Sequence, residues 1–531
     1  MNYSWVVLIP PLIVFLAAFV TRNVILSLSL GISSGALIAT QFQSFAALKL
    51  IKNHLEAQLT DPATAWVFCF LAALGVLVAF ISHAGGTQAY GRFLKKSLHN
   101  ARSAQMASIA LSTLLCFDDF FSCITTGAIM TPITDHFKIP RVKLAFLIDS
   151  LAAPLAILIP VSSWIAMLIM QLSKAGISET IGPSIRIMAD PFTIYLQTIP
   201  FIFYSFFIIG SAIFIVKKNI SFGKMRQQEK IALQSGNLFG GKEPTKIAAR
   251  QSQISNKGNL KDFFIPIALL FIGITGSLLY QGNWWLLGGS KSLFTALIDA
   301  PIFLSLAIGS LVALATSSAF FFIDGTFNKD MLKEGFQSGI KPMGHVIIIL
   351  ISAWSFSALM VNDLQSGVYL ASILTGKVAS WLLPAICFTI AATTSISVGS
   401  SWGTIAILTP LAVPTLLGFG HIPTPATLQE LPLLLPLLGA IFAGAVAGDH
   451  ICPLSSTTIM SSTSSGSYHF DHVATQIEYA TPALATSFIS YLICGFFAEL
   501  YGPWIAVCFA LPLGLLLAIS ILWLKNRNRT S

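Results

Sequence analysis

The sequence predicts an all-α polytopic membrane protein with two inverted-topology repeats and roughly 11–14 membrane segments. The 531 residues are 55% hydrophobic and only 10% charged, whereas soluble domains carry about 25% charged residues. Apolar runs of about 20 residues, long enough to cross a bilayer, recur along the whole chain. Two halves of similar size carry similar polar motifs in the same order, as in transporters built from inverted repeats.

The apolar runs are the expected membrane segments, taken here in chain order. They cover residues 5–21, 24–42, 65–83, 143–172, 193–216, 263–281, 302–323, 343–361, 381–398, 431–449, 475–498 and 501–524. Shorter, broken segments lie between them. The N-terminus has no basic stretch and no small-residue cleavage site, so we expect the first run to be a span rather than a removable signal.

One polar segment divides the chain. Residues 217–261 hold ten of the 30 Lys and Arg residues, and loops rich in these residues stay in the cytoplasm. The segment is expected to be a flexible linker, because it shows little periodicity. The predicted parts are an N-terminal membrane repeat (1–216), the basic cytoplasmic linker (217–261), a C-terminal membrane repeat (262–524) and a basic cytoplasmic tail (525–531). We expect a multi-pass protein of the cell (inner) membrane.

The two halves repeat one pattern. The first has ITTGAIMTPIT at 124–134 and then IPVSSW at 159–164. The second has GTIAILTPLAV at 403–413 and then CPLSST at 452–457. Each half therefore carries a hydroxyl-rich run ending in Thr-Pro, a long apolar segment, and Pro-x-Ser-Ser. Paired interrupted segments of this kind point to a transporter's binding site near the middle of the bilayer.

Charge suggests how the first motif enters the membrane. Basic residues stand on both sides of this motif, which predicts that both of its flanks lie in the cytoplasm. The residues before it are Arg92, Lys95, Lys96 and Arg102, and those after it are Lys138, Arg141 and Lys143. We therefore expect 105–134 to form a re-entrant hairpin, or a broken helix followed by one. Its tip is expected near Ser122, Thr125, Thr126 and Gly127. The counterpart, 400–417, precedes an uncharged stretch, which fits a hairpin from the outside.

Acidic residues inside apolar runs are the strongest functional signal. Five within or at the edge of such runs are singled out: Asp118, Asp119, Asp149, Asp363 and Asp449. A carboxylate at the centre of a bilayer costs several kcal/mol without a partner or water. The adjacent first two lie in the middle of an apolar stretch, so an ion, proton or substrate role is expected. The alternatives are a carboxylate pair facing the cytoplasm and structural, hydrogen-bonded acids.

The candidate ion- and substrate-binding residues combine these acids with nearby hydroxyl and aromatic side chains. They are Asp118, Asp119, Ser122, Thr126, Asp149, Ser150, Ser162 and Ser163 in the first half, and Ser400, Ser401, Trp402, Thr404, Asp449, His450, Ser455 and Ser456 in the second. Na⁺ is a hard cation that prefers oxygen ligands, and its candidate ligands are Asp118, Asp149 and Asp449. A carboxylate that holds either Na⁺ or H⁺ is the minimal machinery of an antiporter. No cofactor and no catalytic residue is expected.

Other readings were weighed for the remaining residues. His469 and His472 have near-metal spacing, but they stand in an apparent polar loop without a carboxylate shell, so a metal site is not favoured. Trp402 and Trp164 are expected to be packing residues or ligand contacts. An intramembrane aspartyl protease using Asp149 and Asp449 is disfavoured, because the expected Gly-x-Gly-Asp and Tyr-Asp patterns are absent.

Four blocks carry a resemblance to a known family. They are FDDFFSCITTGAIMTPITD (117–135), KLAFLIDSLAAPLAILIPVSSW (143–164), GSSWGTIAILTPLAVP (399–414) and AGDHICPLSSTTIMSSTSSGSYHFDHVATQIEYA (447–480). The sequence resembles the NhaC-type Na⁺/H⁺ antiporter family of the ion transporter superfamily. The resemblance implies a secondary transporter with inverted repeats and opposed hairpins that exchanges Na⁺ for H⁺.

The resemblance leaves the solute open. Some relatives exchange or co-transport organic acids or amino acids, so the alternative is a Na⁺- or H⁺-coupled carrier of such a solute. The chain departs from the family pattern at Ser456, where the family usually has Asp. The expected partners are Na⁺, H⁺, the lipid bilayer and, in the alternative, a small organic anion or amino acid. A homodimer is left open.

Overall fold

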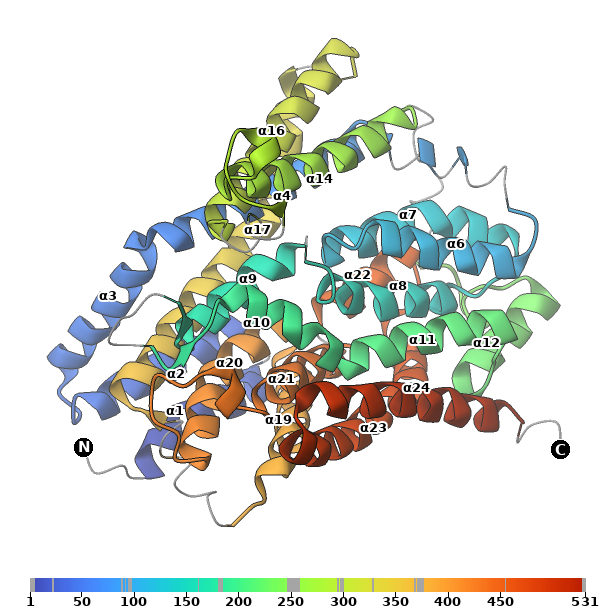
Figure 1. Ribbon diagram of the computed structural model, residues 1–531. Coiled ribbons are helices and arrows are strands. Elements are labelled where there is room, and N and C mark those ends of the chain that lie inside the picture. Colours follow the sequence, from blue (N-terminus) through green and yellow to red (C-terminus); the bar gives the residue numbers. More distant parts are fainter. Residues whose placement is uncertain are drawn as a thin grey trace.

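The computed structural model describes residues 5–527 except 22, 87–88, 91, 94–97, 161, 180–184, 246–257, 294–295, 297–299, 327–328, 367–368, 370–376 and 454. Lys95, Lys96, part of the basic linker and the last four residues of the basic tail therefore lie outside the described residues. Within the described part, seven helical segments are long and apolar enough to cross a membrane (Figure 1). They are α4 (Pro62–His83), the stretch Phe203–Ser235 that holds α11 (Phe203–Lys218) and α12 (Gly223–Ser235), α14 (Lys261–Gln281), α16 (Ile302–Ile323), α20 (Ser401–Phe419), α23 (His469–Tyr501) and α24 (Pro503–Arg527).

The other helices are shorter or less apolar. They are α1 (Ile9–Thr21), α2 (Val24–Ala39), α3 (Ser44–Thr60), α6 (Ala101–Leu114), α7 (Asp119–His136), α8 (Arg141–Ala156), α9 (Ser163–Lys174), α10 (Pro191–Thr198), α17 (Lys329–Ala358), α19 (Leu383–Val398), α21 (Leu434–Asp449) and α22 (Ser456–Ser465). In the described residues the only sheet pairs β1 (Ile177–Ser178) in parallel with β2 (Ile187–Met188). The all-α fold class is thus confirmed.

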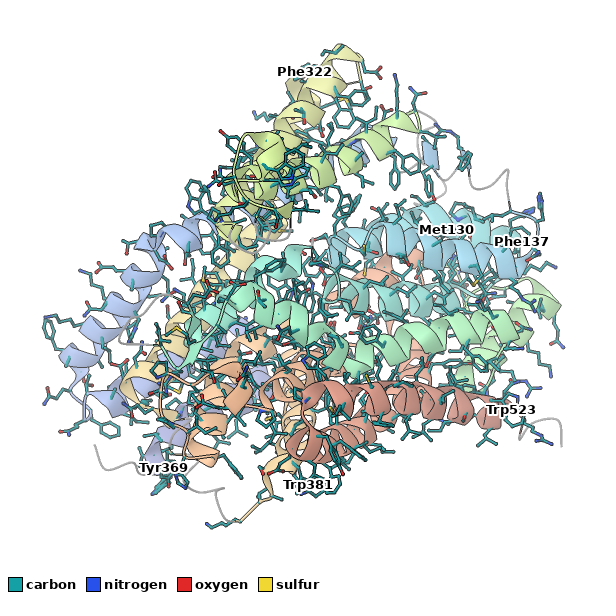
Figure 2. All side chains as sticks on the ribbon, in the orientation of Figure 1. Met130, Phe137, Phe322, Tyr369, Trp381 and Trp523 are labelled. Carbon is teal, nitrogen blue, oxygen red and sulfur yellow. The ribbon has the colours of Figure 1, made fainter. Side chains whose placement is uncertain are left out.

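The outer surface of the helices is apolar, as a lipid-facing surface must be. Phe322 on α16 and Trp523 on α24 are 43% and 47% exposed, and both lie on the outside of the molecule (Figure 2). The polar side chains discussed below are buried among α7, α8, α21, α22 and α23 instead.

Two expected spans are broken in the structure. The run 143–172 is divided between α8 and α9 by residues 157–162, and the run 193–216 is divided between α10 and α11 by a 3₁₀ turn, η2 (Ile199–Phe201). The prediction of continuous spans was wrong here, because Pro160 and Pro200 lack the N–H that a continuing helix needs. At the first break the Ser162 hydroxyl donates to the Ala156 carbonyl at 2.7 Å, which satisfies a carbonyl freed by the helix end.

A helical hairpin is present in the first half, although its tip differs from the prediction. α6 and α7 pack against each other, and residues 115–118 connect them. The expected tip, Ser122 to Gly127, lies inside α7. Helix α7 begins one turn earlier because the Asp118 carboxylate accepts a hydrogen bond from the Phe121 N–H at 2.7 Å, which is a strong N-cap.

The second half has a comparable pair of helices. α19 and α20 are joined at Gly399, whose φ is +68°, and Ser400 caps α20 by accepting from the Gly403 N–H at 3.1 Å. A positive φ favours glycine. The sequences α6–α7–α8–α9 and α19–α20–α21–α22 therefore follow the same order of joints and breaks. The inverted relation between the halves, and the face from which each hairpin enters, stay predictions.

The two sets of helices pack across each other. α7 of the first half packs against α22 of the second, and α20 of the second packs against α9 of the first. Figure 1 shows α22 beside α7 and α8. This exchange brings the broken segments of both halves to the centre of the protein.

The basic linker is more ordered than its composition suggests. Its helix α12 packs against α23 and α8. The Glu229 carboxylate contacts both the Lys143 ammonium and the Ser221 hydroxyl, and Lys242 pairs with Asp471 at 2.7 Å. The linker thus contacts the ends of α8 and α23, and it is helical over Gly223–Ser235.

We expect Glu229→Gln to destabilise the protein by about 3–5 kcal/mol, because it leaves Lys143, which is 2% exposed, as a buried charge without its ion-pair partner. Lys242→Gln, which removes a half-exposed ion pair, is the matched control and is expected to cost about 1 kcal/mol or less. Unfolding of the purified protein in detergent measures both. Equal losses would contradict the structural role of the buried pair.

Candidate functional site

Asp149 lies at the centre of a buried polar cluster. It stands in the middle of α8 and is fully buried. Its Oδ2 accepts from the Thr458 hydroxyl of α22 at 3.2 Å and lies 3.3 Å from His472 Nε2 of α23. Its Oδ1 has no hydrogen-bond partner among the described residues. One carboxylate oxygen is therefore held by protein while the other is available to a ligand.

Asp449 ends α21 and meets the same cluster. The Thr457 hydroxyl donates to Asp449 Oδ2 at 2.9 Å, and the Ser455 hydroxyl lies 3.1 Å from that of Thr457. The Thr458 hydroxyl that binds Asp149 is also 3.4 Å from the Asp449 carbonyl oxygen. One threonine thus connects the acidic residues of the two halves.

His450 follows Asp449 and is fully buried. Its Nδ1 lies 3.0 Å from the Tyr204 hydroxyl of α11, and its Nε2 has no hydrogen-bond partner among the described residues. Asp149 is one of its electrostatic neighbours. His450 therefore lies close to Asp149 as well as next to Asp449 in the chain.

Asp118 and Asp119 are both buried at the start of α7. Asp119 has Asp118 and Asp449 as electrostatic neighbours, whereas Asp118 lines a cavity between α4, α7 and α17. Asp118 is the extended N-cap residue of α7 and Asp119 its first helical residue, and the two carboxylates face different surroundings. Asp119 faces the carboxylate of the second half.

The starts of α9 and α20 meet beside this acid pair. The Ser163 N–H donates to the Phe117 carbonyl at 2.8 Å, and Trp164 and Trp402 pack edge to face with ring centroids 5.8 Å apart. The Ser163 hydroxyl lies near the Asp118 carboxylate and the Trp164 indole near that of Asp119, although neither pair meets hydrogen-bond geometry. The two indole N–H groups have no hydrogen-bond partner among the described residues.

Several candidate hydroxyl groups bind backbone or neighbouring helices, although the Ser401 hydroxyl also lies near the Asp449 carboxylate. Ser122 donates to the Ser112 carbonyl, Thr126 accepts from the Ser112 hydroxyl, Ser150 accepts from Gln476, Thr404 donates to the Ser400 carbonyl, and Ser401 donates to the Ala445 carbonyl. Ser456 is exposed at the start of α22, while the two residues after it are buried. The departure from the family pattern thus falls on a side chain that points away from Asp449.

Three residues of the cluster were not predicted as site residues: Tyr204, Thr458 and His472. The expected polar loop around His472 is wrong, because α23 begins at His469. The sequence did contain a signal, because His472 and Gln476 are four residues apart and so share one face of a helix. His472 reaches Asp149, and Gln476 reaches Ser150.

A resident metal site finds no support in the described part of the chain. His469 lies 3.0 Å from the Ser462 hydroxyl and 2.6 Å from the Pro453 carbonyl instead of sharing a ligand with His472. Among the described residues no group of three or more His, Cys, Asp or Glu is placed to hold a metal.

The fifth acid stands apart from the cluster. Asp363 ends a π-helical turn, η4 (Leu359–Asp363), and pairs with His54 Nε2 of α3 at 2.8 Å. This is the structural role that the sequence left open. The pair resembles Asp149 and His472 chemically while lying outside the site.

Gly127 lets α7 approach α22 closely. A Cβ at this position would lie 2.1 Å from the Ser464 hydroxyl oxygen and 2.8 Å from the Ser464 carbonyl carbon. We expect Gly127→Ala to lower stability by about 1–3 kcal/mol through overpacking. Gly276→Ala on α14, where a Cβ would meet nothing within 4 Å, is the control and should be neutral or stabilising. Thermal unfolding in detergent separates the two, and a loss in the control alone would refute the close contact.

Comparison with known proteins places the chain in a family. Residues 155–496 match the family model described as the Na⁺/H⁺ antiporter family. An uncharacterized protein of Haemophilus influenzae is 31% identical over 495 residues, which cover 92% of this chain and 90% of that protein. The malate-2H⁺/Na⁺-lactate antiporter of Bacillus subtilis is 28% identical over 214 residues, which cover 39% of this chain and 40% of that one.

A solved structure supports the fold. The crystal structure of the Alcanivorax borkumensis YdaH transporter aligns with 86% of this chain and 90% of its own, with a TM-score of 0.51 and 14% sequence identity. At that identity the likeness concerns the fold alone. The apolar helices and the family match together indicate a multi-pass membrane protein that is a transporter rather than an enzyme. Since the family model spans more than half of its residues, the chain belongs to the Na⁺/H⁺ antiporter family.

Proposed function

We propose that the protein exchanges Na⁺ for H⁺ across the membrane, with Asp149 and Asp449 binding the two cations in competition. One observation carries the proposal: Thr458 contacts both acidic residues, at 3.2 Å from Asp149 Oδ2 and 3.4 Å from the Asp449 carbonyl oxygen. A transported ion at this point would touch both halves of the chain.

The chemistry of the cluster suits a small hard cation. Its donors are carboxylate, hydroxyl and backbone carbonyl oxygens, and a helix end such as that of α21 leaves carbonyl oxygens without intrahelical partners. Asp149 Oδ1 is buried and has no hydrogen-bond partner among the described residues. Either a proton or Na⁺ would supply the missing interaction.

Burial explains why one cation must replace the other. An unpaired charge in a dry interior is costly, and Asp119 lies within electrostatic range of both Asp118 and Asp449. The buried carboxylates of the cluster are therefore rarely without a bound Na⁺ or H⁺. A carrier whose site is stable only when loaded exchanges its two cations instead of letting either leak.

The exchange is tested in everted membrane vesicles that hold a pH gradient and a quenched fluorescent pH probe. Addition of Na⁺ is expected to restore the fluorescence, because Na⁺ uptake drives H⁺ out of the vesicle lumen. Vesicles without the protein are the control. Absence of a response to Na⁺ and Li⁺ across the accessible pH range would refute the proposal.

A specific observation favours a second candidate, a Na⁺- or H⁺-coupled carrier of a small organic acid. The buried ends of α9 and α20 meet at Trp164 and Trp402, and neither indole N–H has a hydrogen-bond partner among the described residues. Helix N-termini favour negatively charged groups. The Bacillus subtilis relative is, by its name, an antiporter of malate and lactate.

The second candidate predicts Na⁺-dependent uptake of labelled malate or lactate by proteoliposomes. Trp402→Phe keeps the ring contact but removes the N–H donor, so it should raise the KM for the acid while Na⁺ binding persists. Movement of Na⁺ without either acid would exclude these two solutes.

A further inference from the structure

A cavity of about 260 Å³ lies between α4, α7 and α17. Most of its wall is apolar, including Leu74, Val78, Phe120, Ile124 and Met343, and its polar residues are Asp118 and Thr125 of α7, Ser82 and His83 of α4, and Ser338 of α17. The cluster around Asp149 does not line it. The cavity is thus a separate space that touches the acidic site only through Asp118.

The cavity joins an exposed polar edge to a buried carboxylate. Ser82, His83 and Ser338 are exposed, and His83 Nε2 lies 3.2 Å from the Ser338 hydroxyl across the two helices. At the other end, Asp118 and Thr125 are buried, at 4% and 2% exposed. A mouth made of polar side chains is wettable, and a buried carboxylate attracts a cation.

The helices around the cavity approach each other through glycine. A Cβ on Gly75 of α4 would lie 2.7 Å from the Gly339 carbonyl oxygen of α17, and the converse contact would be 2.5 Å. The backbones therefore touch beside the cavity, and both glycines line it. The space is built by the fold and does not arise from a missing side chain.

The mouth lies at the end of the molecule that holds the basic linker. His83 ends α4, and three residues later a Cβ on Gly86 would lie 2.6 Å from the carbonyl oxygen of Asp262 at the start of α14. Lys261 and Asp324 form an ion pair at that same end. Because the Lys- and Arg-rich linker is expected in the cytoplasm, we expect the mouth to face the cytoplasm.

We propose that this cavity is the cytoplasmic access route by which a hydrated monovalent cation reaches Asp118. The proposal rests on the proposed cation transport. At roughly 30 Å³ for each water molecule, 260 Å³ holds up to about nine waters, which is enough for Na⁺ with its inner hydration shell. Asp118 receives the cation at the inner end, and Asp119, beside Asp449, lies next along the path.

Thiol accessibility tests the route without requiring transport. Thr125→Cys places a thiol inside the cavity, and Thr134→Cys places one on the same helix, equally buried (1% exposed for Thr134) but outside the cavity lining. A membrane-impermeant, positively charged methanethiosulfonate is applied to inside-out vesicles, and the adduct at each position is quantified by mass spectrometry. We expect the Thr125→Cys thiol to react at least about tenfold faster, since reactivity follows access.

Two further conditions sharpen the test. Na⁺ is expected to slow the reaction of the Thr125→Cys variant, and the added substitution Ser338→Trp, at the mouth, is expected to slow it too. Equal rates at the two positions, reaction only from the outer face, or reaction only with a membrane-permeant maleimide would each overturn the proposal, as would indifference to Na⁺. Na⁺-protected labelling without Na⁺/H⁺ exchange would refute the proposed function and leave the access route standing.

Discussion

Asp149→Asn is expected to abolish Na⁺/H⁺ exchange, lowering its initial rate by a factor on the order of one hundred. A hydrogen bond or ligand contact to a charged group contributes up to about 3 kcal/mol, and each 1.4 kcal/mol is about tenfold. The amide keeps the size of the side chain and its contacts with Thr458 and His472, but it carries no charge that Na⁺ or H⁺ could neutralise. The vesicle assay measures the rate, and purified variant protein is checked for normal unfolding.

Asp363→Asn is the matched control for this substitution. Asp363 is also an acid near an apolar run with a histidine partner, His54 at 2.8 Å, yet it lies outside the cluster. The control is expected to exchange at close to the original rate. Similar losses in the two variants would mean that any acid–histidine pair of the fold is needed for stability, and the assignment of Asp149 would fail.

His472→Gln is expected to lower the exchange rate at least about tenfold while preserving Na⁺ binding. The histidine is fully buried, and its Nε2 lies 3.3 Å from Asp149 Oδ2. Glutamine can still donate a hydrogen bond there, but only an imidazole can carry a proton at this position. Loss of rate with retained binding therefore separates proton transfer from the orientation of Asp149.

The readout for His472→Gln combines the exchange rate with Na⁺-induced thermal stabilisation of the purified protein. Binding stabilises the folded state by an amount that rises with the logarithm of the ligand concentration over its Kd, so the Na⁺ shift should persist in the variant. His54→Gln is the control and should alter neither quantity. An unchanged exchange rate in His472→Gln would show that the imidazole merely positions the carboxylate.

The apolar sequence around them was enough to single out four acids that the structure brings together. Asp118, Asp119, Asp149 and Asp449 stand out because a charge is rare and costly in an apolar run, and the structure gathers them from distant parts of the chain. The fold class followed from the same apolar runs. The sequence did not reveal the partner of each acid. Asp363 also stands beside an apolar run, like the other four acids, yet in the structure it pairs with His54 outside the cluster.

The features whose positions were wrongly predicted share a physical cause. The residue at which a helix starts decides which of its side chains face the site. The tip of the first hairpin was expected at the hydroxyl-rich run, yet the Asp118 cap starts α7 before that run. Likewise, Ser456 is a predicted ligand, yet the start of α22 leaves it exposed and buries Thr457 and Thr458. His472 was obscured by polar neighbours that belong to the first turn of α23.

The order of joints and breaks in the two halves supports the expected repeat. Both halves have a helix pair with a capped joint, at Asp118 and at Ser400, followed by a broken helix pair. The halves nevertheless differ in charge at those caps, one being an acid and the other a hydroxyl. The proposed exchange therefore places the cation closer to first-half carboxylates, with Asp449 as the contribution of the second half.

The most direct test uses purified protein in proteoliposomes that contain Na⁺ and a trapped pH indicator, diluted into Na⁺-free buffer. The account predicts rapid acidification of the interior as Na⁺ leaves and H⁺ enters, in proteoliposomes with the original protein and with Asp363→Asn but not with Asp149→Asn. An interior pH that stays constant while Na⁺ leaves, or acidification that persists in Asp149→Asn, would contradict it.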